Sequence, residues 1–170
     1  TYWYHSHQMS SEQAKRGLIG RLVVEPKARV FDYDRDYAVT LQKLNDRIFL
    51  TNGQADGLQL DAKSGETVRL RLINSTNEVQ WMGVAGADFK IVSIDGQDLN
   101  EPGPLSGDWV PVGGGQRYDL LFTMPARGQV HVYSKEKEKL RVALGEGGAP
   151  PKLDPKGKTF DFTAYGVPKE

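Results

Sequence analysis

Hydrophobic and polar side chains alternate along much of this chain, most regularly near its middle. Val68, Leu70 and Leu72 share one face of an expected strand, and Arg69 and Arg71 share the other. Successive side chains of a β-strand point to opposite faces, so this period of two predicts a strand with one apolar face. By alternation or β-prone composition, strands are expected at 2–7, 18–24, 37–44, 47–51, 67–73, 89–94, 118–123 and 129–134, with a strand-like tail at 159–165.

Turn signals separate these expected strands at intervals of roughly ten residues. Asn52-Gly53 and Asp95-Gly96 are dipeptides typical of tight hairpin turns. Helical periodicity is almost absent. The pattern therefore predicts an all-β protein, with strands arranged as an antiparallel sandwich.

One short helix is expected at residues 11–16. Ser10 is its expected N-cap, Gln13 the answering residue of a capping box, and Gly17 its C-terminal stop. Glu12 lies on this helix. We interpret it as a solvated surface carboxylate rather than as a proton donor to a neighbouring site.

The composition indicates a globular chain and excludes several kinds of chemistry. Hydrophobic residues make up 38% and charged residues 26% of its 170 positions, with 22 basic and 22 acidic side chains. This balance leaves no basic field for nucleic acid or for an anionic membrane surface, and no apolar stretch is long enough to span a membrane. The chain has no cysteine, which excludes thiolate metal sites, blue-copper sites among them.

Candidate metal ligands are few, because the chain has three histidines: His5, His7 and His131. Two residues apart on a strand, His5 and His7 are expected to point the same way, as is Trp3. Imidazole is a good ligand for copper, zinc, iron and nickel. The open alternatives are a structural or surface role for the pair and adventitious binding of copper or zinc on an exposed strand.

Residues 1–7, Thr-Tyr-Trp-Tyr-His-Ser-His, are followed by Gln8, Gln13 and the run Gly-Leu-Ile-Gly-Arg-Leu-Val-Val at 17–24. This string resembles the second copper-ligand motif of the multicopper oxidases, the laccase-like family. The resemblance continues in the segments 65–74, 94–97 and 115–120, which look like the family's middle domain.

The resemblance implies a cupredoxin-like antiparallel Greek-key β-sandwich and three parts to the chain. Residues 1–26 would be the C-terminal ligand strands of a preceding cupredoxin domain. Residues 27–145 would be a middle cupredoxin-like domain, and residues 146–170 a linker and strand leading to a following domain. We expect the chain to be a piece of a longer protein.

The resemblance also implies the site and its cofactor. His5 and His7 would each ligate one copper of the type 3 pair in a trinuclear cluster. The family's other ligand motifs are absent from this sequence, so the remaining ligands are expected in flanking cupredoxin domains. The segment alone is therefore expected to be inactive.

The implied activity of the intact protein is that of a copper-dependent oxidoreductase. It would oxidise phenols, aromatic amines or metal ions as small reducing substrates and reduce dioxygen to water. By resemblance only, its location is extracytoplasmic. The alternative is a non-catalytic cupredoxin module with a structural or interaction role, since a fold alone does not establish function.

Several other motif-like residues are interpreted as structural. Met9, Met82 and Met124 are expected to pack in the protein rather than to bind metal. His131 alternates with two valines and is expected on the solvent side of a strand.

Arg117 and Asp119 are two apart on an expected strand. They are expected to form ion pairs with each other's neighbours or with Arg69 and Arg71 across the sheet. If the first 24 residues lack the rest of their own sheet, their apolar side chains are exposed, which favours disorder or docking against another chain. These side chains are Tyr2, Trp3, Tyr4, Leu18, Ile19 and Leu22.

Overall fold

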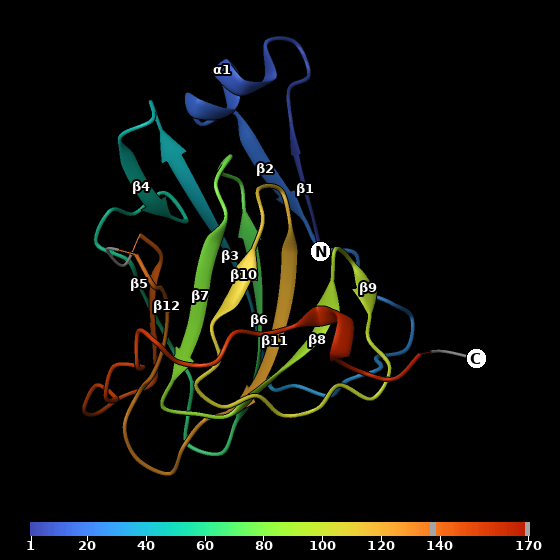
Figure 1. The fold of residues 1–170 in the computed structure, drawn as a ribbon, viewed down its shortest axis with the longest axis vertical. Coiled ribbons are helices and arrows are strands. Elements are labelled where there is room, and N and C mark those ends of the chain that lie inside the picture. The colour runs from blue at the N-terminus through green and yellow to red at the C-terminus, as the bar shows by residue number, and fades with distance from the viewer. Residues whose placement is uncertain (137–138, 169–170) are drawn as a thin grey trace.

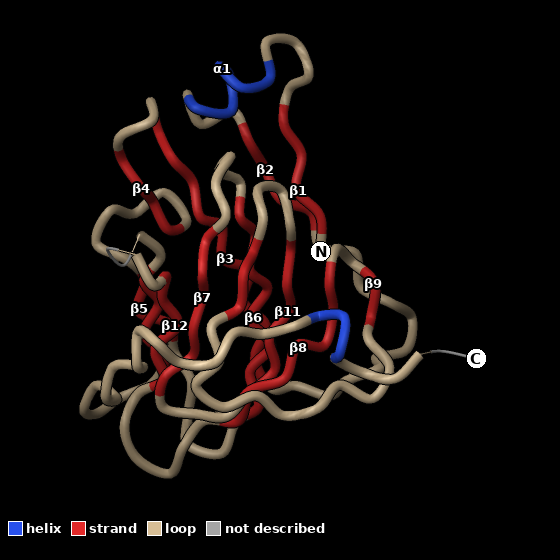
Figure 2. The backbone as a smooth tube through the Cα atoms, in the orientation of Figure 1, coloured by secondary structure: helices blue, strands red, loops and turns tan. Residues whose placement is uncertain are grey.

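Two β-sheets stacked face to face form the body of the protein, and a separate two-stranded hairpin stands beside them (Figure 1). The computed structural model describes residues 1–136 and 139–168. The larger sheet has six strands in the order β4-β3-β6-β11-β8-β9, and the other has five in the order β10-β7-β12-β13-β5. Figure 2 shows how little of the chain is helical.

The elements have the following bounds: β1 Tyr2–His5, α1 Ser10–Lys15, β2 Ile19–Leu22, β3 Arg35–Leu44, β4 Ile48–Thr51, β5 Leu58–Leu60, β6 Thr67–Asn74, β7 Gln80–Ala85, β8 Phe89–Ile94, β9 Gln97–Asp98, β10 Val110–Val112, β11 Arg117–Thr123, β12 Val130–Ser134, β13 Arg141–Leu144 and the 3₁₀ helix η1 Phe162–Ala164. Neither α1 nor η1, the helices that the described residues form, is long and apolar enough to cross a membrane.

The all-β class predicted from alternation is confirmed, and β3, β4, β6, β8, β11 and β12 lie where strands were expected. The sheets are mixed, however, because β3 pairs with β6 and β5 with β13 in parallel. Neighbours that are far apart in sequence can run in the same direction, which alternation within one strand cannot reveal. The strand β7 was missed because it is buried on both faces and so does not alternate.

The apolar core lies between the two sheets. Val68, Leu70 and Leu72 of β6 point into it, as alternation predicted, and each is at most 1% exposed. Met82 and Met124 are buried there, which confirms their predicted packing role. The same expectation was wrong for Met9, which is 71% exposed. It lies in the turn just before α1, where its backbone is left-handed and the side chain has no core to enter.

The outer face of the six-stranded sheet is also covered. Arg69 and Arg71 point to this face, but they are only 6% and 2% exposed. Thr1 of the hairpin and Glu25 of the segment that leads from β2 to β3 pack over them, and Asp36 of the neighbouring strand β3 also binds Arg71. The strand β6 is therefore buried on both sides, by apolar contacts on one and charged contacts on the other.

The helix α1 forms close to its expected place but begins one residue earlier. Met9 occupies the N-cap position and makes no side-chain capping bond, so the predicted Ser10 cap is wrong. Gly17 follows the helix with a φ of 92°, in agreement with its predicted role as the stop.

The C-terminal segment lies across the sandwich rather than extending as a strand. Thr159 makes an isolated bridge to Trp109, and Phe160, only 5% exposed, packs in the core. The expected strand at 159–165 is otherwise wrong. The Asp161 carboxylate accepts a bond from the Thr163 backbone N–H and caps η1, because Asp side chains compete for nearby backbone donors.

Candidate metal centre

The candidate ligands stand on the hairpin formed by β1 and β2. The two strands are antiparallel, with Tyr2 opposite Leu22 and His5 opposite Ile19, and α1 lies at the tip (Figure 1). Opposite Gly20, the Tyr4 ring lies so close that a Cβ there would stand 2.2 Å from the ring's Cζ. This close approach explains why position 20, the second glycine of the run at 17–24, requires a residue without a side chain.

The rings of His5 and His7 stack on one another. Their centroids are 4.9 Å apart with an interplanar angle of 25°. The strand β1 ends at His5 and His7 lies in the bend that follows, so the strand is shorter than predicted. The two side chains nevertheless point together, and the predicted juxtaposition holds.

Trp3 extends the stack from the other side. Its ring centroid lies 4.5 Å from that of His5, with an interplanar angle of 19°. The alternation along β1 predicted this shared face, while Tyr4 and Tyr2 on the opposite face are 65% and 42% exposed. The three rings form one column that runs from the sandwich toward solvent at His7.

The His5 ring is oriented by its neighbour. Its Nδ1 lies 3.0 Å from the Ser6 carbonyl oxygen. A carbonyl can only accept, so Nδ1 carries the hydrogen and, in the neutral ring, Nε2 keeps its lone pair free for a metal. Metal-bound histidines commonly use the second nitrogen in this way. The donor set therefore fits a copper ion held through His5 Nε2.

The pair is not a complete metal site within the part of the chain that the structure describes. No group of three or more His, Cys, Asp or Glu side chains there could hold a metal ion. Two imidazoles leave most coordination positions of a copper pair open. A copper pair held here would need further ligands from outside the described residues.

The hairpin is attached to the two-sheet sandwich at Trp3. The Trp3 indole Nε1–H donates to the Gly115 carbonyl oxygen at 3.0 Å. Trp3 and His5 also line a cleft of about 140 Å³ between the hairpin and the loop that contains Thr76 and Glu78. The strand that carries His5 is thus held against the sandwich through Trp3.

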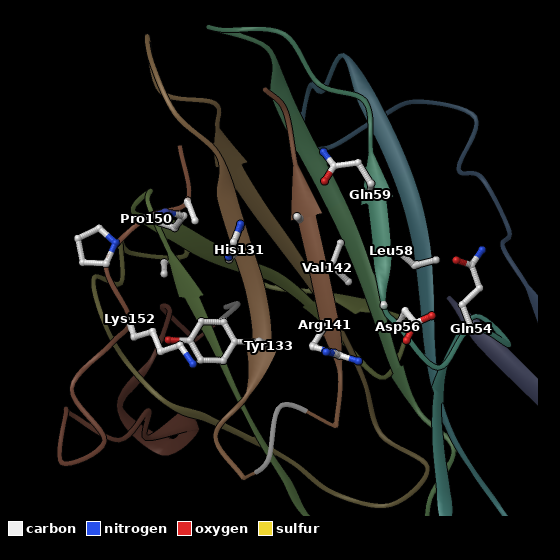
Figure 3. A pocket seen from close by; sticks show the side chains of 15 residues that line it. Gln54, Asp56, Leu58, Gln59, His131, Tyr133, Arg141, Val142, Pro150 and Lys152 are labelled. Carbon is white, nitrogen blue, oxygen red and sulfur yellow. The ribbon is translucent and has the colours of Figure 1, made fainter. Parts of the chain in front are cut away.

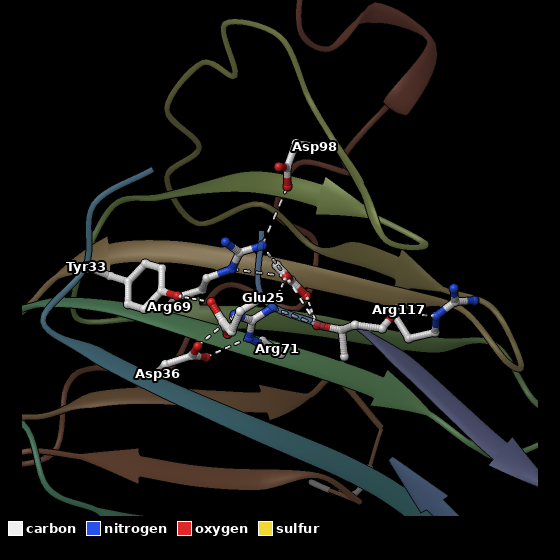
Figure 4. Close-up of polar contacts among 9 residues, drawn as sticks. Glu25, Tyr33, Asp36, Arg69, Arg71, Asp98 and Arg117 are labelled. Atoms are coloured by element: carbon white, nitrogen blue, oxygen red, sulfur yellow. Dashed lines mark hydrogen bonds and ion pairs between the residues drawn. The ribbon is translucent and has the colours of Figure 1, made fainter. Parts of the chain in front are cut away.

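A buried group of charges attaches the hairpin at its other end (Figure 4). The Asp119 carboxylate accepts from Arg69 Nη2 at 2.7 Å and from Arg71 Nη1 at 3.3 Å. The predicted pairing of Asp119 with these two arginines is therefore confirmed. The Thr1 hydroxyl donates to Asp119 at 3.2 Å and accepts from Arg71 at 3.1 Å. Arg117 holds the same residue by donating from Nε to the Thr1 carbonyl oxygen at 3.1 Å.

Arg71 also binds Asp36 of the neighbouring strand β3 and Glu25 of the segment between β2 and β3. Its Nε and Nη2 each donate to one oxygen of Asp36 at 2.7 Å, and Nη2 reaches Glu25 at 2.9 Å. Burial raises the pKa of the Asp36 carboxyl, but the Arg71 hydrogen bonds and charge outweigh burial and hold this pKa below its usual value. For Arg71, burial lowers the pKa, but the hydrogen bond to Asp36 and the charge of Asp119 outweigh burial and raise this pKa above its usual value. The guanidinium therefore stays charged.

His131 lies away from this site, on the outer face of the five-stranded sheet. It lines a surface pocket of about 590 Å³ together with Tyr133 and Arg141 (Figure 3). Its Nε2 lies 2.9 Å from the Gln129 side-chain oxygen. Glu12, the other residue considered for chemistry, forms an exposed ion pair with Arg16 at 2.7 Å, as its predicted surface role implies.

Comparison of the sequence with known proteins relates the chain to one family. The sequence model of the family described as "Multicopper oxidase" matches residues 1–146. Laccase-3 of Botryotinia fuckeliana is 29% identical over 153 aligned positions, covering 72% of this chain and 33% of that protein. The iron transport multicopper oxidase FET3 of Kluyveromyces lactis is 29% identical over 146 positions, covering 72% of this chain and 22% of that protein.

Solved structures share the architecture. The crystal structure of Fet3p, described as a multicopper oxidase that functions in iron import, superimposes with a TM-score of 0.75 at 17% identity, covering 96% of this chain and 38% of that one. A multi-copper oxidase from Pseudomonas thermotolerans gives a TM-score of 0.71 at 25% identity, covering 92% of this chain and 44% of that one. The fold is thus a cupredoxin-like sandwich. With the match over residues 1–146, the chain belongs to the multicopper oxidase family.

Proposed function

We propose that this chain supplies two copper ligands and the middle domain of a multicopper oxidase. His5 and His7 each ligate one copper of a type 3 pair within a trinuclear cluster. The observation that carries this proposal is the stacked pair, with the His5 Nε2 lone pair freed by the Nδ1–H bond to Ser6. Membership of the family supports copper as the metal.

Bound copper would supply the transfer of single electrons toward dioxygen. The chain's own residues hold the site. The Ser6 carbonyl oxygen keeps the hydrogen of the His5 ring on Nδ1. The middle domain holds the hairpin in place through Trp3 and Thr1.

The chain spans about a third or less of the curated relatives named above. The proposed whole protein therefore contains flanking cupredoxin domains that carry the remaining ligands. We assign residues 1–26 to the end of the preceding domain, 27–145 to the middle domain and 146–170 to the segment leading onward. The proposed reaction is oxidation of a phenol, an aromatic amine or a metal ion with reduction of dioxygen to water, outside the cytoplasm.

The alternative is a non-catalytic function, since a fold alone does not establish activity. The chain would then belong to a cupredoxin module with a structural or interaction role. The flanking sequence separates the two functions. The oxidase requires a His-x-His-Gly motif before Thr1 and a cysteine flanked by histidines after Glu170.

The ligand assignment is tested in the longest natural protein that contains this chain. The copper-to-protein ratio is measured by atomic absorption after loading and gel filtration. His5→Ala combined with His7→Ala is expected to abolish retention of the paired copper, whereas the control His131→Ala leaves the ratio unchanged. An unchanged ratio in the double variant overturns the assignment. The 170-residue chain alone, supplied with copper, is expected to show no turnover of a phenolic substrate.

A further inference from the structure

We infer that Trp3 is a positioning residue, through which the middle domain sets the place of the copper-ligand pair. This inference rests on the proposed role of His5 and His7. It assigns to the middle domain a specific contact with the site, in addition to its role as a spacer between domains.

The first observation is the column of rings. Trp3, His5 and His7 stack in order, with centroid separations of 4.5 Å and 4.9 Å. The His5 ring therefore lies between two flat surfaces that restrict its tilt. The bond from its Nδ1 to the Ser6 carbonyl oxygen restricts its rotation within that plane. Together these contacts fix the orientation of the ring and therefore the direction in which Nε2 points.

The second observation is that Trp3 is itself held by the middle domain. Its indole N–H donates to Gly115 at 3.0 Å, in the loop between β10 and β11. A Trp ring that is bonded at one edge and stacked on one face has a defined position. The position of the His5 ring therefore depends on the middle domain as well as on its own hairpin.

The third observation is that hydrogen bonds and close packing hold the acceptor loop. The Gly115 N–H donates to the Asn74 carbonyl oxygen at 2.7 Å, and the fully buried Asn74 amide donates to Val112 at 2.9 Å. Gly113 N–H is bound by the Gln116 side chain at 2.6 Å. A Cβ on Gly114 would stand 2.6 Å from the Thr76 carbonyl oxygen, so the loop packs directly on its neighbour. A loop held in this way offers the Gly115 carbonyl oxygen at a defined place, and so fixes the place of the Trp3 ring.

The fourth observation is the periodicity of the attachment. Thr1, Trp3 and His5 lie two residues apart, so they share the face of β1 that is turned to the middle domain. Thr1 is fixed by Asp119, Arg71 and Arg117, and Trp3 by Gly115. The next residue on that face is the proposed ligand. The strand is thus held at two consecutive points before it presents His5.

Metal affinity is sensitive to such support. Groups that orient a ligand typically contribute a factor of about 10–100 to metal affinity. Removing the Trp3 ring is expected to act in this range, because it removes both the stack and the bond to the middle domain. Trp3→Phe keeps a ring for stacking and loses only the bond, so its effect should be smaller.

The test uses the copper-loaded natural protein that contains this chain. Copper release is titrated with a chelator of known affinity and followed as the copper-to-protein ratio. Trp3→Leu is expected to weaken copper retention about 10- to 100-fold, with Trp3→Phe intermediate. The matched control is Trp81→Leu, a half-buried tryptophan on β7 whose ring faces Lys135 at 5.9 Å. It should leave copper retention unchanged.

Thermal unfolding of the copper-free proteins separates positioning from general stability. A merely structural role of Trp3 predicts a lower melting temperature with wild-type copper retention in the folded fraction, which overturns the inference. If Trp3→Leu does not fold, Trp3→Phe decides: wild-type retention in this variant overturns the inference. If His5→Ala with His7→Ala loses copper while the Trp3 variants keep it, only the inference fails. If the double histidine variant keeps it too, the proposed function fails.

Discussion

On one face of the six-stranded sheet, Leu70 and Leu72 lie in an apolar core against the five-stranded sheet. On the other face of the same sheet, Arg69, Arg71 and Asp119 lie under the hairpin and the segment that follows it. These side chains of both faces are almost completely removed from water. They differ in the kind of contact that covers them.

This difference assigns separate tasks to the two faces. Apolar contacts stabilise in proportion to the area buried and tolerate small shifts of the covering element. Bonds between guanidinium and carboxylate are directional, so they fit only one placement of the groups that cover them. The charged face is therefore suited to holding the ligand hairpin at a defined position, whereas the apolar face stabilises the domain.

The largest effect is expected from Asp119→Ala. Its carboxylate is 1% exposed and bonded to Arg69 and Arg71, so removal leaves the buried Arg69 with only the 3.6 Å carboxylate contact to Asp98 among the described residues and takes one of three carboxylates from Arg71. The expected loss is about 4 kcal/mol in the free energy of unfolding, measured by urea denaturation. Asp119→Asn, which keeps the shape, is the matched variant and should lose less. A loss below about 1 kcal/mol for Asp119→Ala would contradict the importance of the charged face.

Leu70→Ala tests the apolar face of the same strand. The side chain is fully buried, and its truncation is expected to cost about 3 kcal/mol through lost burial and a cavity. The same urea titration measures this loss. Protease cleavage within the hairpin under native conditions should stay slow in Leu70→Ala and become faster in Asp119→Ala. Equal acceleration in both variants would show that the two faces do not have separate tasks.

Acid should weaken the charged face before it affects the apolar one. The pKa of Asp36 is lowered in the folded protein below its ordinary value of 3.8, because the Arg71 bonds outweigh burial. Its contribution to stability is therefore complete above the unfolded pKa and is lost as the pH falls through the lower folded pKa. Asp36→Asn should flatten the dependence of the unfolding free energy on pH below about pH 4. The exposed Asp32→Asn is the control, and identical curves for wild type and Asp36→Asn would refute this assignment.

The smallest effect is expected from Arg16→Ala on α1. Its pair with Glu12 is exposed, with 70% and 48% of the two side chains accessible. An exposed pair of this spacing contributes about 0.3–0.5 kcal/mol, and added salt should remove that contribution. Urea denaturation at low and high salt measures it. A loss comparable with that of Asp119→Ala would mean that burial is not what makes the charged face strong.

The sequence by itself determined the class of fold and the identity of the candidate ligands. Alternation at 67–73 and 118–123 predicted strands because one face of each is buried in the core. The string at 1–7 with the glycines at 17 and 20 resembles a copper-ligand motif, and the hairpin geometry shows why these glycines are needed. The pairing of Asp119 with arginines on a neighbouring strand could also be predicted, since opposite charges on one sheet face lie within reach.

Only the tertiary structure decided what covers the outer face of the six-stranded sheet and how the ligands are held. Arg71 looks like a solvated strand position in the sequence, and its burial depends on residues up to 70 positions away. The bond between Trp3 and Gly115 joins residues 112 positions apart. Periodicity reports which side of a strand faces the core, but it carries no information about a distant segment that packs on the other side. For that reason the candidate pair, His5 and His7, could be predicted from seven residues, whereas the attachment of their strand to the sandwich required the folded chain.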